Sequence, residues 1–504
     1  MEETFLLLQG FYKASMFLLQ HVAGCVGGAS KMSGAVDRRT FLRRAGLVAG
    51  SLAFVGPLQA LAERMASGAP LLDPGYGSLM NRGDLWLPRG FQYRIISRQG
   101  DLMSDGAPTP SRFDGMSAFA GHDGSTILIR NHENKRRFQA GSVFSPDNEI
   151  DVEVPADLRY DPAFWNGGVT KLVVEDRVVT ESYAVIGGTS HNCAGGPTPW
   201  GSWITCEEIA QSPPGSGTLR HGYIFEVDAY TTEPVLATAI TAAGRFEHEA
   251  VAWLGGVLYE TEDRQDASFY RYTPSINPAR SGDLAAGGIL EALVVDGMTT
   301  LDTRSSTAWP GGVGTSHHVS WVQVPNPDPA DDRPAAMQGV RFQAQALGGA
   351  IFARTEGCWA ADDGKVYFDC TNGGGSSPTA TDGNGQIFAL DPGNSTLTLV
   401  YQSPLGEFSP LIRPDNMVMA ATGDLFLCED HPAGTVANHI RGLTPDGGIF
   451  DFARAETNPT EFCGACFDEK GLTIYVNQQG NAEGAQGVTY AIWGPWKRNG
   501  QPGE

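Results

Sequence analysis

Several familiar kinds of segment are missing from this 504-residue sequence. No GxSxG elbow, phosphate loop or dinucleotide fingerprint stands in a strand–turn–helix setting, which disfavours nucleophilic serine chemistry. After the N-terminal region, no apolar run approaches the length of a membrane span, so we expect no stable membrane insertion. Helix signals beyond residue 70 are few and short, which argues against a mainly helical fold.

Positive charge is also scarce. The chain has 35 Lys and Arg against 57 Asp and Glu, and its formal net charge is −22. Nucleic acids and anionic membrane surfaces repel such a protein, so we expect neither as a partner. The acidic excess suits a protein that collects cations, but it is equally compatible with a surface that is merely kept soluble.

Glycine and proline, by contrast, are plentiful, at 64 and 31 residues. With 41% hydrophobic and 18% charged residues, the composition is that of a globular, turn-rich, all-β protein rather than a disordered one. The length suits one large domain or two ordinary ones.

The N-terminal region has the order of an export signal. Paired Arg38–Arg39 precede Thr40-Phe41-Leu42, a modest Gly/Ala-rich apolar run, and a small-x-small site at Ala60–Ala62. This order predicts a twin-arginine signal, with the twin-arginine translocase as a partner and a periplasmic or secreted location. We expect residues 1–62 to be removed, with the true start at Met16 or Met32, and residues 63–504 to form one β-propeller domain.

A loose strand pattern recurs along the rest of the chain: a turn glycine, then alternating apolar and other residues, then a polar or acidic end. It reads GSTILIRN, GSWITCEE, GVLYETED, GKVYFDCT, GDLFLCED and GLTIYVNQ, starting at Gly124, Gly201, Gly256, Gly364, Gly423 and Gly471. Six such strands predict a six-bladed β-propeller with insertions between the blades.

Three of these strands end in two consecutive acids: Glu207-Glu208, Glu262-Asp263 and Glu429-Asp430. In a propeller, equivalent strand ends gather at one mouth of the central channel, and neighbouring residues on a strand point opposite ways. One acid of each pair should therefore face the channel axis. Crowded carboxylates raise one another's pKa unless cations separate them, so the pattern predicts a metal cluster at the channel mouth.

Carboxylate oxygens favour hard cations such as calcium, magnesium, manganese or ferric iron. A thiolate among them is a ligand that iron tolerates and calcium does not favour, and Cys193 is the candidate. Two alternatives for Cys193 stay open: a disulfide with Cys206, or a buried thiol. Seven cysteines follow the signal, an odd number, so at least one is unpaired unless it bonds another molecule.

Further candidates stand near the repeats. In GRFEHEAVAW, Glu249 ranks above His248 as a ligand, because a single His there is more often a core group. Arg354, two residues before Glu356, suits a phosphate group, since a guanidinium fork matches an oxyanion bidentately. Asp415 precedes the fifth repeat as either a ligand or a turn residue. LIRNHE adds Arg130 and Asn131 as candidate catalytic groups and Glu133 as a candidate metal ligand.

Together these segments resemble the PhoX alkaline phosphatases, in order from about residue 90 to 496. The segments that carry the resemblance are LIRNHE, NCAGGPTPWGSWITCEE, FEHEA, YETED, FARTEG, RPDN, LFLCED and EFCGACFDEKGLTIYVNQQ with the closing AIWGPW. The resemblance implies a six-bladed propeller that hydrolyses small phosphomonoesters outside the cytoplasm, using a mixed iron and calcium cluster whose bound oxygen attacks phosphorus.

The resemblance also assigns roles to residues. It places the iron-ligand cysteine at Cys193 and the phosphate-binding arginine at Arg354. Metal carboxylates fall on Glu133, on Glu207 or Glu208, on Glu249 or Glu262, and on Glu356, to which we add Asp263, Glu429 and Asp430. Two rival hypotheses remain. A calcium-dependent lactonase or diesterase would use fewer carboxylates and has no reason for a thiolate beside them, and a non-catalytic binding propeller would not turn over a chromogenic phosphomonoester.

Overall fold

The computed structural model describes seven ranges of the chain: 75–134, 149–162, 166–210, 219–406, 409–431, 436–481 and 484–496. All of them belong to the second of two compact units, Leu72–Glu504. The predicted twin-arginine signal, its cleavage site and the boundary at residues 62 and 63 lie outside the described residues. Within the described residues, no helix has the length and apolar character of a membrane span.

Antiparallel strands make up the described fold, as the composition predicts. The six-stranded sheet runs β1 (Leu79–Asn81), β2 (Leu85–Pro88), β23 (Ile449–Ala455), β22 (His439–Leu443), β21 (Leu425–Glu429) and β20 (Pro414–Met419). The three-stranded sheet runs β10 (Ile224–Asp228), β9 (Ser202–Glu207) and β8 (Asn192–Pro197). The two four-stranded sheets run β24 (Phe462–Phe467), β25 (Thr473–Gln478), β26 (Val488–Trp493) and β3 (Gln92–Arg98), and β4 (Phe113–Ala120), β5 (Thr126–His132), β6 (Gly167–Glu175) and β7 (Val178–Thr189).

The largest sheet has nine strands, and the pairing of β15 with β19 joins its two halves. It runs β11 (His248–Leu254), β12 (Val257–Glu262), β13 (Tyr270–Pro274), β14 (Gly288–Val295), β15 (Ser316–Gln323), β19 (Thr396–Gln402), β18 (Gln386–Asp391), β17 (Val366–Cys370) and β16 (Thr355–Ala360). The described helices are short: η1 (Ala156–Leu158), η2 (Thr241–Ala243), η3 (Asp283–Ala286), η4 (Pro334–Ala336) and α4 (Val340–Ala346).

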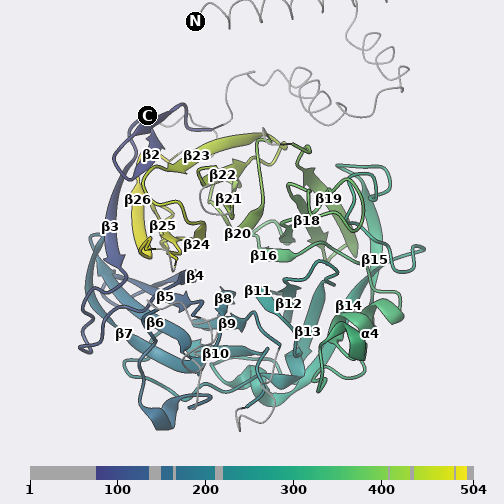
Figure 1. Cartoon of the computed structure of the whole chain (residues 1–504), viewed down its shortest axis with the longest axis horizontal. Coiled ribbons are helices and arrows are strands. Elements are labelled where there is room, and N and C mark those ends of the chain that lie inside the picture. Colours follow the sequence, from purple (N-terminus) through teal and green to yellow (C-terminus); the bar gives the residue numbers. More distant parts are fainter. Residues whose placement is uncertain are drawn as a thin grey trace, which may run out of the picture. The chain divides into compact units, whose positions relative to one another are not determined.

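Within the described residues, six hairpins repeat around a common centre: β4/β5, β8/β9, β11/β12, β16/β17, β20/β21 and β24/β25. Their first strands contact one another in that order, and β24 contacts β4. The first strands thus form a closed ring, which Figure 1 shows end-on. The second strands contain the six repeats found in the sequence. An all-β fold with a propeller-like arrangement is therefore confirmed.

Small residues allow this ring to close tightly. A Cβ atom at Gly115 of β4 would lie 2.5 Å from Cα of Ala194 in β8, and one at Gly357 of β16 would clash with the backbone oxygen of Asp415 in β20. Only glycine permits such close backbone approach. Small residues such as Gly115 and Gly357 therefore bring neighbouring first strands together.

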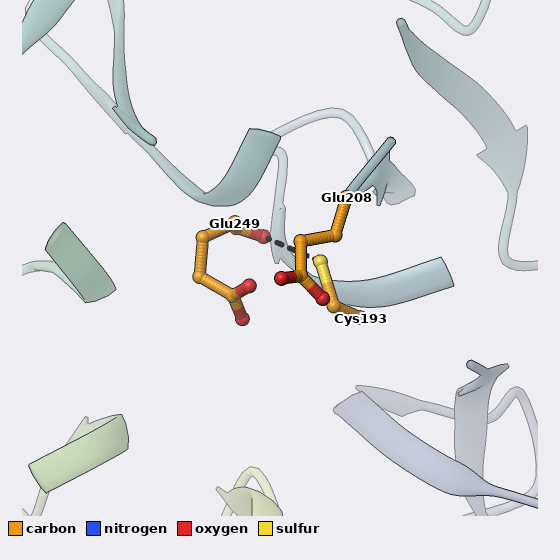
Figure 2. A group of neighbouring side chains, drawn as sticks. All are labelled: Cys193, Glu208 and Glu249. Atoms are coloured by element: carbon orange, nitrogen blue, oxygen red, sulfur yellow. Dashed lines mark hydrogen bonds between the residues drawn. The ribbon is translucent and has the colours of Figure 1, made fainter. Parts of the chain in front are cut away.

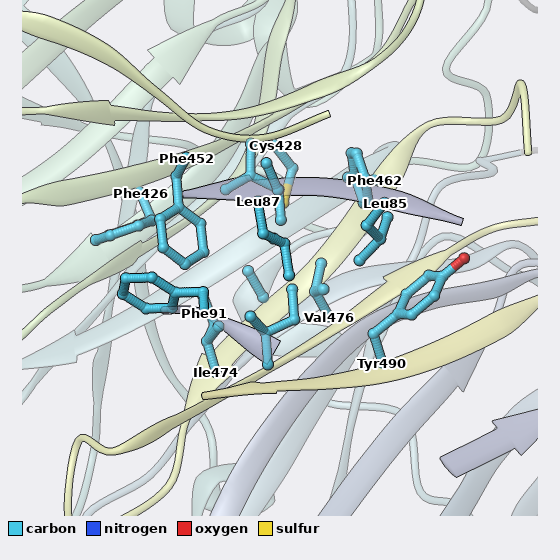
Figure 3. Close-up of a cluster of buried hydrophobic side chains, with 14 of the residues drawn as sticks. Leu85, Leu87, Phe91, Phe426, Cys428, Phe452, Phe462, Ile474, Val476 and Tyr490 are labelled. Atoms are coloured by element: carbon cyan, nitrogen blue, oxygen red, sulfur yellow. The ribbon is translucent and has the colours of Figure 1, made fainter. Parts of the chain in front are cut away.

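The N-terminal strands join the two ends of the described unit. β3 pairs with β26, and β2 pairs with β23. Leu85 and Leu87 of β2 are fully buried against Phe452 and Ile474 in one apolar cluster (Figure 3). Burying each such side chain contributes about 1.5–3 kcal/mol relative to leaving it in water. Apolar packing between the first and last strands thus holds the ring closed.

Candidate metal centre

A β-bulge occurs near the start of each first strand of the ring. In β8, for example, Asn192 pairs with Glu207 and Gly195 pairs with Thr205, so that Cys193 and Ala194 stand outside the ladder. A bulge breaks the alternation of a strand and redirects a side chain. The residue that follows the first paired residue is, around the ring, Asp114, Cys193, Glu249, Glu356, Asp415 and Cys463. We call these six residues the inner tier, and all of them are buried.

Acids of the inner tier converge on one another. Ligand atoms of Glu249, Glu356 and Asp415, from three successive hairpins, lie within 4.8 Å of one another. Ligand atoms of Cys193, Glu208 and Glu249 form a second group of the same size, in which the thiol and two carboxylates turn toward one another (Figure 2). Glu249 belongs to both groups, so the two groups are continuous.

Burial and mutual repulsion dominate the electrostatics of these groups. Burial raises the pKa of Glu249 well above its ordinary value, and the nearby charges of Glu356 and Asp415 raise it further. The pKa of the Cys193 thiol is raised by burial and then by Glu249 and Glu208. A cation between them would offset both effects.

A second tier stands where each second strand ends. The residue after the last paired position donates its N–H to the backbone oxygen of the residue just before the first strand's first pair, as in Glu208 to His191 and Asp263 to Glu247. The outer tier formed in this way consists of Glu133, Glu208, Asp263, Thr371, Asp430 and Gln479. In each of the three strand-end acidic pairs, the second acid (Glu208, Asp263 or Asp430) belongs to this tier.

The first acid of each pair has separate buried partners. Glu207 accepts hydrogen bonds from the backbone N–H of Ser190 at 3.0 Å and of Gly222 at 2.9 Å, and His221 Nδ1 lies 2.7 Å away. Glu429 accepts from Ile412 N and from Arg441 Nε. These carboxylates tie loops to strand ends.

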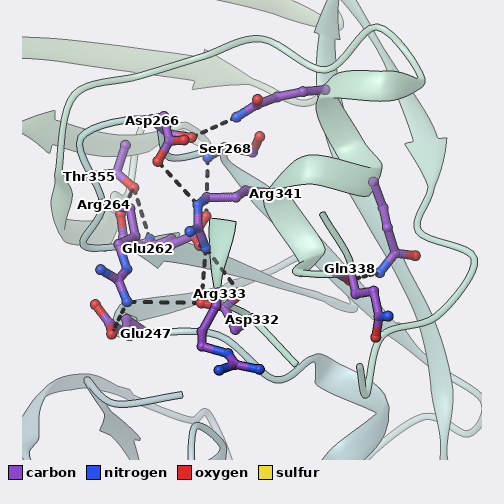
Figure 4. A network of polar contacts seen from close by, with 12 residues as sticks. Glu247, Glu262, Arg264, Asp266, Ser268, Asp332, Arg333, Gln338, Arg341 and Thr355 are labelled. Carbon is purple, nitrogen blue, oxygen red and sulfur yellow. Dashed lines mark hydrogen bonds and ion pairs between the residues drawn. The ribbon is translucent and has the colours of Figure 1, made fainter. Parts of the chain in front are cut away.

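Glu262 belongs to a polar network that extends to helix α4 (Figure 4). Tyr270 donates to it at 2.7 Å, and Arg341 of α4, itself 1% exposed, contacts both Glu262 and Asp332. Burial raises the pKa of Glu262 to about 7, and Arg341 opposes that rise. We therefore leave Glu207, Glu262 and Glu429 out of the candidate centre, whose ligands would come from the second acids.

Arg354 lies at this mouth between the two tiers. Its Nε and Nη2 donate to the two carboxylate oxygens of Asp263 at 2.7 and 2.9 Å, and Nη2 also donates to Glu356 at 2.7 Å. Burial by itself would lower the pKa of Arg354, but Glu356 and Asp263 raise it, so the guanidinium stays charged. Its backbone is left-handed, with φ 51°. Residues other than glycine rarely adopt this conformation, and those that do are often found at functional sites.

Comparison with models of known protein families identifies the family of this chain. Residues 75–185 and 173–481 match the family model described as alkaline phosphatase PhoX. The chain belongs to the PhoX family. A search of the curated proteins found no match.

One solved structure shows the same fold. The structure of Pseudomonas fluorescens PhoX in complex with vanadate, a transition state analogue, matches with a TM-score of 0.61 and 18% identity over 82% of this chain and 97% of that chain. A protein of unknown function from Dyadobacter fermentans matches with a TM-score of 0.43 and 10% identity over 81% and 99% of the two chains.

Two residues that the sequence suggests for PhoX catalysis lie elsewhere. Arg130 is 1% exposed, stacks on the Phe113 ring at 3.6 Å, and donates to hydroxyls such as Thr489 at 2.8 Å. Asn131 donates to the backbone oxygens of Cys193 at 2.9 Å and of the next residue at 2.7 Å. Asn131 therefore supports the bulge that carries Cys193, and Arg130 is a core residue, so neither enters the proposed site.

Some residues of this candidate centre were missed in the sequence. Asp114 belongs to the inner tier, and its pKa is raised by burial and then by Glu133 and Asp415. Glu461, whose pKa is raised by burial and then by Asp430, stands just before the first pair of β24. A signal was present, since each inner-tier residue precedes Gly, Ala or Asn near the start of a strand.

The described residues fit a group of hard cations. Buried carboxylates crowd together at the mouth, and among the described residues Arg354 is the cation that hydrogen-bonds directly to an inner-tier acid. All seven described cysteines are free and buried, so Cys193 retains a thiol and forms no disulfide with Cys206. The oxygen ligands that group with the Cys193 sulfur match calcium together with iron better than a soft metal alone.

Proposed function

We propose that this chain is an exported phosphomonoesterase of the PhoX type, with six propeller blades built on the six hairpins. The observation that carries the proposal is the convergence of inner-tier and outer-tier acids, together with the Cys193 thiol, beside a charged arginine. The family match supports phosphatase chemistry, and the paired arginines of the N-terminal region support export through the twin-arginine translocase to the periplasm or beyond. Acids alone would repel a phosphate ester, so substrate binding at this mouth requires bound cations.

Calcium ions and ferric iron are the cofactors we propose. Cys193, Glu208 and Glu249 would hold iron, since the thiolate is the ligand that distinguishes it from calcium. Glu356, Asp415 and Asp114 would complete the cluster, with Glu133, Asp263 and Asp430 at its edge. When bound, such ions polarise phosphoryl oxygens and make a water-derived nucleophile available near neutral pH.

Arg354 would grip the transferred phosphoryl group. Asp263 and Glu356 occupy its Nε and Nη2, and these contacts hold the guanidinium plane in one orientation. Its Nη1, which donates to none of the described residues, remains available for a phosphoryl oxygen. A group positioned in advance stabilises the charge of the transition state without a reorganisation cost.

One pair of variants tests the proposal. Cys193→Ser should lower both the iron content and the rate of p-nitrophenyl phosphate hydrolysis in protein loaded with iron and calcium. Cys466→Ser is the matched control, because Cys466 is a buried thiol in β24 that belongs to neither tier; it should retain iron and activity. Undiminished turnover in iron-free Cys193→Ser protein would remove Cys193 from the mechanism.

A further inference from the structure

A third set of equivalent residues surrounds the mouth. The residue just before the first pair of each hairpin accepts a hydrogen bond from the outer-tier N–H through its backbone oxygen. We call this set the rim, and it consists of Arg112, His191, Glu247, Arg354, Arg413 and Glu461. Arg354 is thus one of three arginines that occupy the same structural position in different hairpins.

Arg112 reproduces the geometry of Arg354. Its backbone has φ 54° where Arg354 has φ 51°. Arg354 donates to Asp263, the outer-tier residue of the preceding hairpin, and Arg112 donates from Nη1 at 2.6 Å to Gln479, the outer-tier residue of its own preceding hairpin. The two side chains are also similarly accessible, at 24% and 17% exposed. By contrast, no hydrogen bond or ion pair with a described residue fixes the guanidinium of Arg413.

The partner of Arg112 differs in charge from that of Arg354. Gln479 is neutral, and its amide donates to Asp114 at 3.1 Å and to Glu133 at 2.8 Å, which turns its oxygen toward Arg112. Among the described residues, both side-chain hydrogen bonds of Arg112 come from Nη1, and the carboxylate of Glu149 lies 3.5 Å from Nε. Within the described ranges, Nη2 has no hydrogen-bond partner, and no carboxylate engages two nitrogens of this guanidinium.

The position of Arg112 in the ring decides what it can bind. β16 belongs to the third hairpin after β4/β5 in a ring of six, with two hairpins between them on either side, so β4 and β16 lie on opposite sides of the centre (Figure 1). We propose that Arg112 binds a second anionic group of the substrate, on the opposite side of the mouth from the phosphoryl group at Arg354. The preferred substrates are then phosphomonoesters whose leaving group carries its own carboxylate or phosphate. This inference rests on the proposed phosphatase function.

Two substrates that differ in one charge test the inference. The ratio of kcat/KM for 4-carboxyphenyl phosphate to that for 4-carbamoylphenyl phosphate tests the charge, because the substituents have similar size and the more electron-withdrawing amide, as the better leaving group, favours the opposite outcome. We expect the native metal-loaded protein to favour the carboxylate by about tenfold, which corresponds to one hydrogen bond between charged groups. The difference should appear in KM rather than in kcat. An acidic mouth without a second anion site would favour the neutral amide instead.

Variants assign the preference to Arg112. Arg112→Gln should abolish the preference while it retains turnover of the carbamoyl substrate, and Arg112→Lys should keep part of it. Arg280→Gln, which removes the same charge from a side chain that is 85% exposed, should leave the ratio unchanged.

Each outcome has a definite meaning. A native protein that shows no preference, or an Arg112→Gln variant that keeps it, overturns the inference, and the first of these results needs no variant to fold. If neither ester is cleaved by the native metal-loaded protein, the proposed function itself fails. If the carbamoyl ester is cleaved without any preference, only the second anion site fails.

Discussion

Two adjacent glutamates should respond in opposite ways to the same substitution. Glu207→Gln should destabilise the fold and Glu208→Gln should not, although both side chains lose one charge. The reason is that Glu207 ties a loop to a strand end, whereas Glu208 belongs to the group of ligands at the mouth.

The contacts set the magnitude. Glu207 is 0% exposed and accepts from two backbone N–H groups within 3.0 Å, and the ring nitrogen of His221 lies 2.7 Å from it. A glutamine would turn an N–H₂ group toward one of these donors, and the loss of a buried charged partner costs about 3–5 kcal/mol. At Glu208, burial and then Asp263 and Glu133 raise the pKa. Removing that charge should change the stability of the metal-free protein by less than about 1 kcal/mol, or raise it.

Urea unfolding of both variants, with chelator and with calcium and iron, measures the two effects. Glu207→Gln should lower the midpoint in both conditions. Glu208→Gln should keep the native midpoint in chelator and lose most of the stabilisation that the metals add. Two results would refute the assignment of a structural role to Glu207 and a ligand role to Glu208. One is that Glu208→Gln costs as much stability in chelator as Glu207→Gln, and the other is that Glu207→Gln unfolds like the native chain.

Three further outcomes are expected. Arg354→Lys should lower kcat/KM for p-nitrophenyl phosphate by about 10–100-fold, because an ammonium cannot reproduce the planar fork that binds Asp263 and an oxyanion together; an unchanged kcat/KM in steady-state assays would contradict this role. In chelator, thermal stability followed by circular dichroism should fall as pH rises from about 4 to 8. Burial raises the pKa of both Asp415 and Glu247 to about 8, so the folded state holds protons that the unfolded state releases. Calcium should reduce this fall, and a stability that does not change with pH would count against the crowding of acids. Gly357→Ala should cost about 1–3 kcal/mol in urea unfolding and lower the bound metal, since the new Cβ would clash with Asp415, whereas the same change at Gly393, where the nearest atom is a side-chain oxygen 3.3 Å away, should do neither.

The second strands could be predicted from the sequence because their pattern is local. Each has a turn glycine followed by alternating side chains, and this alternation also predicts that only one acid of a pair faces the channel. Which one it is depends on hydrogen bonds from distant segments. Glu207, for instance, is held by Ser190 and Gly222, and no spacing rule contains that information.

Counting from the turn glycine fails where a hairpin has a different length. Glu207 lies six residues after Gly201, but its structural equivalent in the first hairpin, His132, lies eight residues after Gly124. A count of six from Gly124 reaches Arg130 instead, whereas the register places Arg130 in the core. Bulges hide the inner tier in a similar way, because the residue that leaves the ladder, such as Asp114, interrupts the very alternation that identifies a strand.

Metal content measured beside turnover tests the central claim most directly. The mature chain, titrated with chelator, should lose bound calcium and iron and p-nitrophenyl phosphate hydrolysis in parallel, and it should regain activity when both metals are restored. Full activity in a preparation that elemental analysis shows to be free of metal would contradict the claim that the converging acids and Cys193 act through bound cations.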